Sequence, residues 1–455
     1  MRTVNEQLGK SGARFGVACR EAGTESHRAM LDIRAIRENP DLVKTRLRAR
    51  GGDACNLIDA VLACDEERRA AETAKQQLQS RRKNLSKEIG MKRGRGEDAA
   101  DVENEVRGIN GEINRLDVLG DASAARQAGL LMGIPNLPHD GCPQGDDETA
   151  NPVIREWGRK PEITDPLDHV ELATRHGLID WDGGVRVAGS GFVVYRGAGA
   201  RLERALINFL LDTQTAHGYE EVNVPHLVRR ECMEGTGQLP KFEDDMYGTD
   251  AGEDGANRMF LAPTAEVPVT NLYRDTLLAE ADLPRRLCAC TPCFRREAGS
   301  AGRENKGIIR MHQFDKVELV QIVHPDHGFL VLEELTGHAE AVLRKLGLHY
   351  RVIELCTGDL GFSSAKTYDI EVWAPGHGTY LEVSSCSCFT DYQARRMKLR
   401  FKDKDGKNRF PHTLNGSGTA LPRLYVAILE QCQQPDGTVV LPDALVPYFG
   451  AAKLP

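Results

Sequence analysis

The feature that most constrains this chain is a heptad pattern that runs, with one interruption, from Leu57 to Leu116. Steps of four and three residues place one stripe of side chains on a single helix face. A glycine-rich break over 90–96 divides the stripe into two segments, which predicts an antiparallel helical hairpin. About 33 residues at 1.5 Å per residue give an arm roughly 50 Å long. The stripe consists of Leu57, Val61, Cys64, Arg68, Ala71, Lys75, Leu78, Arg82, Leu85 and Ile89, then Val102, Val106, Ile109, Ile113 and Leu116.

The charge of the hairpin indicates a partner for it. Between residues 66 and 95 there are ten cations and four acids, whereas the whole chain has a formal net charge of −8. Periodicity alone is equally typical of a coiled coil that joins two subunits, and a charged face can simply be solvated. A basic distal half on an acidic protein favours contact with nucleic-acid phosphates. The cations expected to make that contact are Arg81, Arg82, Lys83, Lys87, Lys92 and Arg93.

Chain length, a helix cap and a stretch rich in turn-forming residues divide the chain into regions. A chain of 455 residues exceeds one typical domain. Residues 1–29 lack periodicity and are expected to be a disordered extension. A capped helix at Asn39-Pro40 opens the hairpin domain over 30–133. A stretch rich in Pro, Gly and Asp over 134–152 is expected to be a linker, and 153–455 forms the body.

Composition excludes some classes of protein. No run of 18 apolar residues is present, so no membrane span is expected. Twelve cysteines without a secretory signal favour reduced thiols and a cytoplasmic location.

The body alternates helical and strand patterns without an internal repeat. The stretch 202–215 predicts a helix, and those at 221–225, 350–355, 367–373 and 379–383 predict strands. This pattern is typical of an α+β fold on a mostly antiparallel sheet. Neither a Gly-x-Gly-x-x-Gly turn after a strand nor a P-loop lysine motif occurs, so any nucleotide must be held in another way.

The stretch 291–318 carries the densest set of reactive side chains and predicts a strand, a glycine-rich loop and a second strand. Arg295 and Glu297 would share a face of the first strand. Guanidinium groups suit phosphates, an aromatic ring can stack on a base, and carboxylates suit amines. A salt-bridged surface strand is the alternative. The second strand would present Arg310, His312, Phe314, Lys316 and Glu318 on one face.

These residues resemble motif 2 of the class II aminoacyl-tRNA synthetases, and in particular of the seryl-tRNA synthetase family. The resemblance rests on Phe294-Arg295-Arg296-Glu297, a loop at 298–303, and Arg310-Met-His-Gln-Phe314. It covers the chain from about Met30 to the C-terminus, hairpin included. Further motifs in family order are Gly235-Thr-Gly-Gln-Leu-Pro-Lys-Phe, Pro263-Thr-Ala-Glu-Val-Pro, Glu382-Val-Ser-Ser-Cys-Ser, Asp391-Tyr-Gln-Ala-Arg-Arg, His412-Thr-Leu-Asn-Gly-Ser-Gly and Arg423.

The resemblance implies a class II synthetase domain that activates L-serine with ATP and Mg²⁺ and charges tRNA(Ser), with tRNA(Sec) as an open second acceptor. It also implies a homodimer, with Pro225 as the motif 1 proline at the interface. Arg295 and Arg423 would be catalytic, and Glu382 and Ser385 would hold Mg²⁺. Serine would meet Thr264, Ala265, Glu266, Arg295, Glu318 and Ser417; ATP would meet Arg295, Arg296, Glu297, Arg310, Phe314, Glu382, Val383, Ser384, Ser385 and Arg423.

Some residues resist this interpretation. Glu382 and Ser385 fall on opposite faces of a regular strand, so a shared ion requires a bulge or a strand end between them. The family usually has Cys-Ser-Asn-Cys where this chain has Cys386-Ser-Cys388-Phe389, and glycine in place of Pro422. These departures put local packing in doubt.

Two other functions and one possible metal site compete with this interpretation. A ligase that loads a carrier protein would lack the hairpin, and an inactive RNA-binding relative would lack the site residues. A zinc site at Cys288, Cys290 and Cys293 has no paired Cys-x-x-Cys spacing and no fourth ligand nearby in sequence, so idle thiols are expected.

Overall fold

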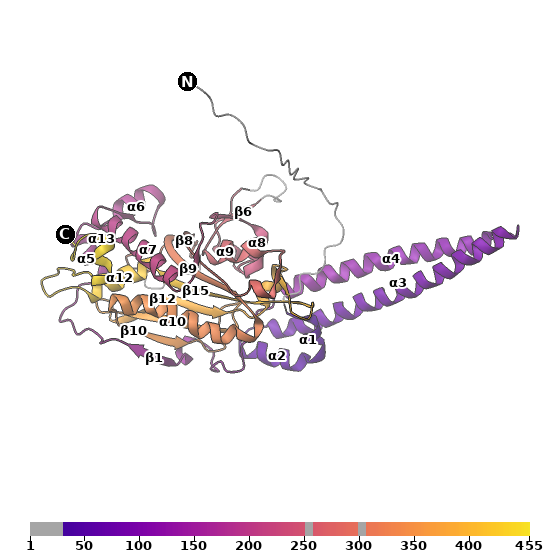
Figure 1. The fold of residues 1–455 in the computed structure, drawn as a ribbon, viewed down its shortest axis with the longest axis horizontal. Helices are drawn as coiled ribbons and strands as arrows, with labels where there is room; N and C mark the ends of the chain where they lie inside the picture. Colours follow the sequence, from indigo (N-terminus) through magenta and orange to yellow (C-terminus); the bar gives the residue numbers. More distant parts are fainter. Residues whose placement is uncertain (1–30, 251–257, 299–305) are drawn as a thin grey trace, which may run out of the picture.

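A computed structural model describes residues 31–250, 258–298 and 306–455, so the expected extension over 1–29 lies outside the described residues. A helical arm projects from a body built around one large sheet (Figure 1). None of the helices in these ranges combines the length and apolar character needed to cross a bilayer.

The arm is the predicted hairpin. Its two helices, α3 (Leu57–Gly94) and α4 (Ala100–Met132), pack along each other. The break lies later than predicted: Gly90 is inside α3, and the chain turns over 95–99, where Gly96 adopts a φ of +73°. A single glycine costs a long packed helix little, whereas the positive φ requires one.

Two of the three basic positions of the heptad stripe, Lys75 and Arg82, are paired across the arm, and Arg68 pairs with Asp65 on its own helix. Nζ of Lys75 lies 3.0 Å from Oδ1 of Asp117, and a guanidinium nitrogen of Arg82 donates to Oδ1 of Asn110 (3.0 Å). Long basic side chains keep their stems on the seam and their charged ends in water. These two pairs also fix the register of α3 against α4.

The base of the arm is anchored to the body. The helices α1 (Ile33–Glu38) and α2 (Pro40–Ala49) share an apolar cluster with the start of α3, the end of α4 and two body residues, Phe362 and Tyr392. Asn39 caps α2 as predicted, by accepting from the backbone N–H of Leu42. The segment after α4 runs along the body, because the side chain of Asn136 donates to the carbonyl oxygens of Ser363 (2.9 Å) and Phe389 (2.7 Å).

The body is built on an eight-stranded sheet that is antiparallel except for its last pair, which confirms the predicted α+β class. Strand order is β1 (Val153–Trp157), β10 (Tyr350–Glu354), β11 (Lys366–Ala374), β12 (Thr379–Cys388), β15 (His412–Ala420), β9 (Gln313–Val323), β8 (Arg285–Phe294) and β4 (Glu220–Glu221). Small sheets join β2 (Ile179–Asp180) to β3 (Val194–Tyr195), β5 (Leu227–Arg229) to β6 (Met259–Leu261), and β7 (Leu277–Ala279) to β13 (Arg400–Lys402) and β14 (Asn408–Arg409).

Helices close the main core over the sheet. The helix α10 (Gly328–Leu346) packs on β12 and β15, α12 (Leu421–Gln431) packs on β9, β11 and β12, and α7 (Ala198–Ala216) packs on β8 and β9. The remaining helices are α5 (His169–Arg175), α6 (Trp181–Ala188), α8 (Arg230–Thr236), α9 (Glu266–Thr270), α11 (Tyr392–Arg396) and α13 (Val446–Phe449).

The strands of the motif 2 region are shorter than predicted. β8 ends at Phe294 and β9 begins at Gln313, so Arg295, Glu297 and Arg310 lie beyond the strand ends rather than on them. Glu297 has a φ of +51°, which stops a strand, and the N–H of His312 bonds to the carbonyl of Gly191 outside the sheet. Phe314, Lys316 and Glu318 do share a face of β9, as predicted.

Candidate functional site

A cavity of about 330 Å³ lies where β9, β12 and β15 meet the first turn of α12. A larger hollow of about 650 Å³ near Leu283 and Arg409 contains none of the predicted site residues. The smaller cavity is therefore the candidate site. Its walls include Thr264, Glu266, Arg295, Glu297, Arg310, Phe314, Glu382, Val383, Ser385, Ser417 and Arg423, all predicted from sequence, and Gln238, Ile308, Ile309, Met311, Lys316, Asn415, Ala420 and Pro422.

One end of the cavity is a buried polar pocket. Glu318 is fully buried on β9 beneath Thr264 and Lys316: Oγ1 of Thr264 donates to its Oε2 (3.0 Å), and Lys316 forms an ion pair with the same oxygen. Oε1 of Glu318 is buried without a hydrogen-bond partner in the described part of the chain. A buried carboxylate oxygen without a partner costs free energy, so this oxygen is suited to a donor supplied by a ligand.

A second carboxyl group faces the same pocket. Glu266 is buried at the start of α9, where its two oxygens accept from side-chain amides of Gln393 (2.7 Å) and Asn415 (2.9 Å). Burial, and then repulsion by Glu318, raises the pKa of Glu266 to about 7. The pocket therefore gains negative charge as the pH passes through neutrality.

The other end of the cavity combines guanidinium groups with an aromatic ring. The Arg295 guanidinium lies over the Phe314 ring, 5.3 Å from its centroid. Arg310 and Glu297 form an ion pair of 2.6 Å between Nε and Oε2. Arg423, in the first turn of α12, donates to the carbonyl oxygens of Glu382 (2.7 Å) and Ile309 (3.2 Å). Forks and a ring on facing walls can hold a phosphate chain and a flat base.

The bulge that the Glu382–Ser385 pair requires is present in β12. Ile370 pairs with Ser384 and Glu371 pairs with Glu382, so the ladder skips Val383. The extra residue brings Glu382 and Ser385 to the same cavity wall. Beside them, burial and then the Glu382 carboxylate raise the pKa of Asp369, whose Oδ1 is buried without a hydrogen-bond partner in the described residues. These carboxylate and hydroxyl oxygens are the donors that Mg²⁺ prefers.

Some predicted residues lie outside the cavity walls. Ala265 and Ser384 are buried behind them, and the Ser384 hydroxyl donates to the carbonyl of Ser417 (2.5 Å). The Arg296 side chain is exposed, and Glu318 forms a layer beneath the wall. Sequence reasoning missed Gln238 and gave Lys316 no role of its own, although period two placed Lys316 between Phe314 and Glu318.

The departures from the family pattern fit the core. Cys386, Cys388 and Phe389 are buried, and Pro422 occupies the first turn of α12, where a missing N–H and a fixed φ are tolerated. Cys288 and Cys290 share one face of β8 and Cys293 lies on the other, so the three do not converge as ligands. Burial raises the pKa of both Cys288 and Cys290 to about 12, which opposes the thiolate form.

The cations predicted on the arm belong to α3, which projects away from the body that holds this cavity (Figure 1), and three of them have partners on α4. Arg81 pairs with Glu105 (2.5 Å) and Arg93 with Glu103 (2.7 Å). The acids of α4 therefore offset part of the basic charge that the α3 sequence presents alone. Lys83 and Lys87 are exposed, with no acidic partner within ion-pair distance among the described residues.

Comparison with known proteins supports the resemblance seen in the sequence. Residues 30–138 match the seryl-tRNA synthetase N-terminal domain, and residues 247–432 match the tRNA synthetase class II core domain (G, H, P, S and T). A serine–tRNA ligase of Akkermansia muciniphila is 70% identical over 93% of this chain and 98% of its own, and one of Laribacter hongkongensis is 51% identical over 93% and 99%. Seryl-tRNA synthetase of Pyrococcus horikoshii, solved with ATP, is 37% identical over 93% of this chain and 99% of its own, with a TM-score of 0.89.

Proposed function

The chain belongs to the seryl-tRNA synthetase family, so it activates L-serine with ATP and transfers the seryl group to tRNA(Ser), and we propose that the cavity on β9, β12 and β15 carries the activation step. The observation that supports this most is the buried Oε1 of Glu318, which has no partner in the described residues at the polar end of the cavity. An ammonium group is the donor that best satisfies it. Serine would therefore bind with its ammonium toward Glu318 and Glu266 and its hydroxyl among Thr264, Lys316 and Ser417.

The reaction needs alignment rather than a nucleophilic side chain. A carboxylate oxygen of serine forms a bond to the α-phosphorus of ATP, and the bond from that phosphorus to the bridging oxygen breaks to release pyrophosphate. Arg295, which lies over Phe314 and whose Nε donates to the carbonyl of Pro263 next to Thr264, would hold the serine carboxylate and the α-phosphate together. Phe314 and Arg423 would enclose the adenine, Glu297 would accept from its amine, and Arg310 would meet the distal phosphates.

Magnesium fits the acidic wall of the cavity. Glu382 and Ser385 would hold the ion, because the bulge at Val383 places both side chains on the cavity wall. When bound there, the ion would supply positive charge to offset that of the phosphates. Arg296 is exposed, so it would reach ATP only from outside the cavity. Ser384 would act indirectly, through the hydrogen bond that its hydroxyl donates to the carbonyl oxygen of Ser417.

The arm is proposed to grip tRNA through the exposed lysines on α3, Lys83 and Lys87, together with the other predicted cations there. We also propose a homodimer with Pro225 at its interface and a cytoplasmic location. The location is supported by the free cysteines of the described chain.

Two matched variants test the assignment of the two ends. Glu318→Gln, which keeps the shape but removes the charge, should raise KM for serine by about 100-fold or more in pyrophosphate exchange and leave KM for ATP nearly unchanged. Arg423→Gln should raise KM for ATP and spare KM for serine. If both variants changed the same KM, the cavity would not be divided in the way proposed.

A further inference from the structure

We infer that His169 and Glu430 are positioning residues for the ATP end of the cavity, where they fix the backbone that supports Arg423. This inference rests on the proposed function, because it takes Arg423 as part of the ATP site. Neither residue lines the cavity. Both are fully buried, on α5 and α12.

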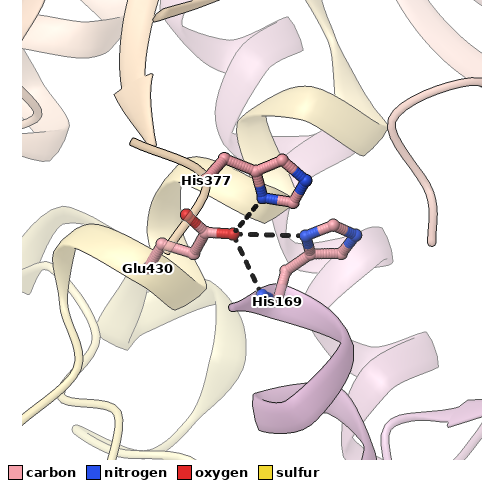
Figure 2. Close-up of side chains that lie close together, drawn as sticks. All are labelled: His169, His377 and Glu430. Carbon is pink, nitrogen blue, oxygen red and sulfur yellow. Dashed lines mark hydrogen bonds and ion pairs between the residues drawn. The ribbon is translucent and has the colours of Figure 1, made fainter. Parts of the chain in front are cut away.

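Glu430 is the centre of a buried cluster of donors (Figure 2). One oxygen, Oε1, accepts from the backbone N–H of His169 (3.0 Å), from Nδ1 of His169 (3.2 Å) and from Nδ1 of His377 (3.3 Å). The other oxygen accepts from the N–H of Gly376 (2.9 Å). Four bonds from two chain segments, one at His169 and one at Gly376 and His377, hold the carboxyl group and both rings in one arrangement.

His169 passes this arrangement on to the cavity wall. Its Nε2 accepts from the backbone N–H of Ile308 (3.3 Å), and Ile308 is a wall residue. A ring nitrogen that accepts carries no proton, so the ring proton lies on Nδ1 and faces Glu430. The geometry therefore assigns one tautomer to His169, and Glu430 stabilises it.

The segment around Ile308 is held from two sides by the same helix. Arg423 and Glu430 are seven residues apart on α12, which is two turns. Arg423 donates to the carbonyl of Ile309, and Glu430 holds the ring that accepts from the N–H of Ile308. Gly307 packs so closely that a Cβ there would lie 2.1 Å from Nε2 of His169. Loss of the His169 acceptor would therefore loosen the support of Arg423.

Among the described residues, His169, His377 and Glu430 are the one group of three or more His, Cys, Asp or Glu side chains whose ligand atoms lie close enough together to hold a metal ion. A metal bound at Nδ1 of His169 would require the ring proton on Nε2, where it would point at the N–H of Ile308. Two donors would then face each other in a buried site. The hydrogen bonds thus favour a proton-bearing network over an ion.

Two substitutions at His169 separate its two contacts. His169→Asn keeps an N–H donor near the Nδ1 position for Glu430 but removes the acceptor for Ile308. His169→Gln places its amide oxygen near the Nε2 position and so keeps that acceptor. In pyrophosphate exchange, His169→Asn should raise KM for ATP about tenfold, the order expected for one buried N–H left without a partner. His169→Gln should restore most of it, and KM for serine should stay within about twofold in both.

His377→Ala is the control, because it removes a donor to the same Glu430 oxygen and His377 has no hydrogen bond to Ile308; it should lower Tm without changing KM for ATP. Elemental analysis of the wild-type protein should find far less than one zinc or other transition-metal ion per chain. Equal KM values for ATP in His169→Asn and the wild type would overturn the inference, as would an equal rise in KM for serine or one bound transition-metal ion per chain. If Arg423→Gln also left KM for ATP unchanged, the proposed ATP site would fail; if only His169→Asn did so, the positioning inference alone would fail.

Discussion

At the scale of single residues, we propose that the candidate site uses buried carboxylates for the serine ammonium and partly buried guanidinium groups for the phosphates of ATP. Glu318 and Glu266 lie close together at the polar end of the cavity. Lys316 forms an ion pair with Glu318 there. An incoming ammonium would compete with Lys316 for Glu318. Sequence periodicity placed Phe314, Lys316 and Glu318 on one face, but it could not reveal this pairing, because ion pairs depend on side-chain conformation.

The raised pKa of Glu266 predicts how serine binding depends on pH. Because its pKa is about 7, Glu266 is mostly protonated at pH 6 and mostly ionised at pH 8. An ionised carboxylate attracts the serine ammonium, so KM for serine in pyrophosphate exchange should fall as the pH rises across this range. Glu266→Gln should flatten that part of the profile. A wild-type profile as flat as that of the variant would contradict the prediction.

The same shift has the opposite sign for the stability of the free protein. The folded-state pKa lies above the ordinary value of 4.5, so Glu266 takes up protons more readily when folded. The free energy of unfolding therefore falls as the pH rises from about 4.5 to about 7. Above about pH 7 this group no longer changes the free energy of unfolding, because it is ionised in both the folded and the unfolded state. The difference in Tm between Glu266→Gln and the wild type should grow in favour of the variant over this range. A constant difference would argue against a raised pKa.

At the scale of elements, the arm and the bulged strand show what sequence can and cannot predict. The heptad stripe predicted two packed helices, because burial of one stripe is a local periodic property. It misplaced the turn, since Gly90 can stay in a long helix. It also overstated the basic charge of the arm, because Glu103 and Glu105 of α4 face Arg93 and Arg81. For β12, the alternation of side chains along a strand showed only that a shared ion at Glu382 and Ser385 requires a bulge or a strand end between them. It did not show that the bulge lies at Val383.

The register of the arm defines a clean shortening experiment. Lys75 faces Asp117 and Arg82 faces Asn110, so residues 80–112 form a matched distal section. Replacement of this section by a four-residue glycine-rich turn should leave serine-dependent pyrophosphate exchange within about twofold, since the cavity lies in the body. Transfer of serine to tRNA should fall by about 100-fold or more. Normal charging of tRNA by the shortened protein would refute a tRNA-binding role for the arm.

Electrostatics gives a finer test of the same element. Lys83 and Lys87 are two exposed arm cations without an acidic partner among the described residues, and the exposed Lys402 and Lys407 on the body serve as a matched pair. Lys83→Gln with Lys87→Gln should flatten the slope of log affinity for tRNA against log salt by about 0.7–0.9 for each phosphate that the arm no longer binds. The body pair changed to Gln should leave the slope unchanged. Equal effects of the two double variants would point to general charge rather than a site.

At the scale of the whole molecule, we propose that the body carries the activation step and that the arm binds tRNA. The body holds the cavity, and the arm is anchored to the body through the cluster that contains Phe362 and Tyr392. The order of motifs between Gly235 and Arg423 indicated the family, and the family resemblance implied the α+β body. The layer position of Glu318 and the packing of residues 134–152 on the body depend on contacts between distant segments, which no local pattern encodes.

The oligomeric state of the shortened protein tests whether the arm binds tRNA or instead joins two subunits as a coiled coil. We expect light scattering on a sizing column to give twice the chain mass of 50.2 kDa for the full chain, and twice its own smaller chain mass for the form that lacks residues 80–112. The reason is that Pro225, proposed at the interface, lies in the body. A shortened protein that became monomeric and lost exchange activity at the same time would assign the arm to dimerisation instead.

The central claim is that this one cavity selects serine, and pyrophosphate exchange measured with each of the twenty amino acids tests it most directly. A buried pocket that hydrogen-bonds the substrate hydroxyl rejects an analogue without it by about 10⁴-fold or more. Serine should therefore give the highest kcat/KM by a wide margin, with alanine below it because it lacks the hydroxyl and threonine below it because the pocket must also accommodate its methyl group. Alanine exchange at a rate equal to that of serine would contradict the account.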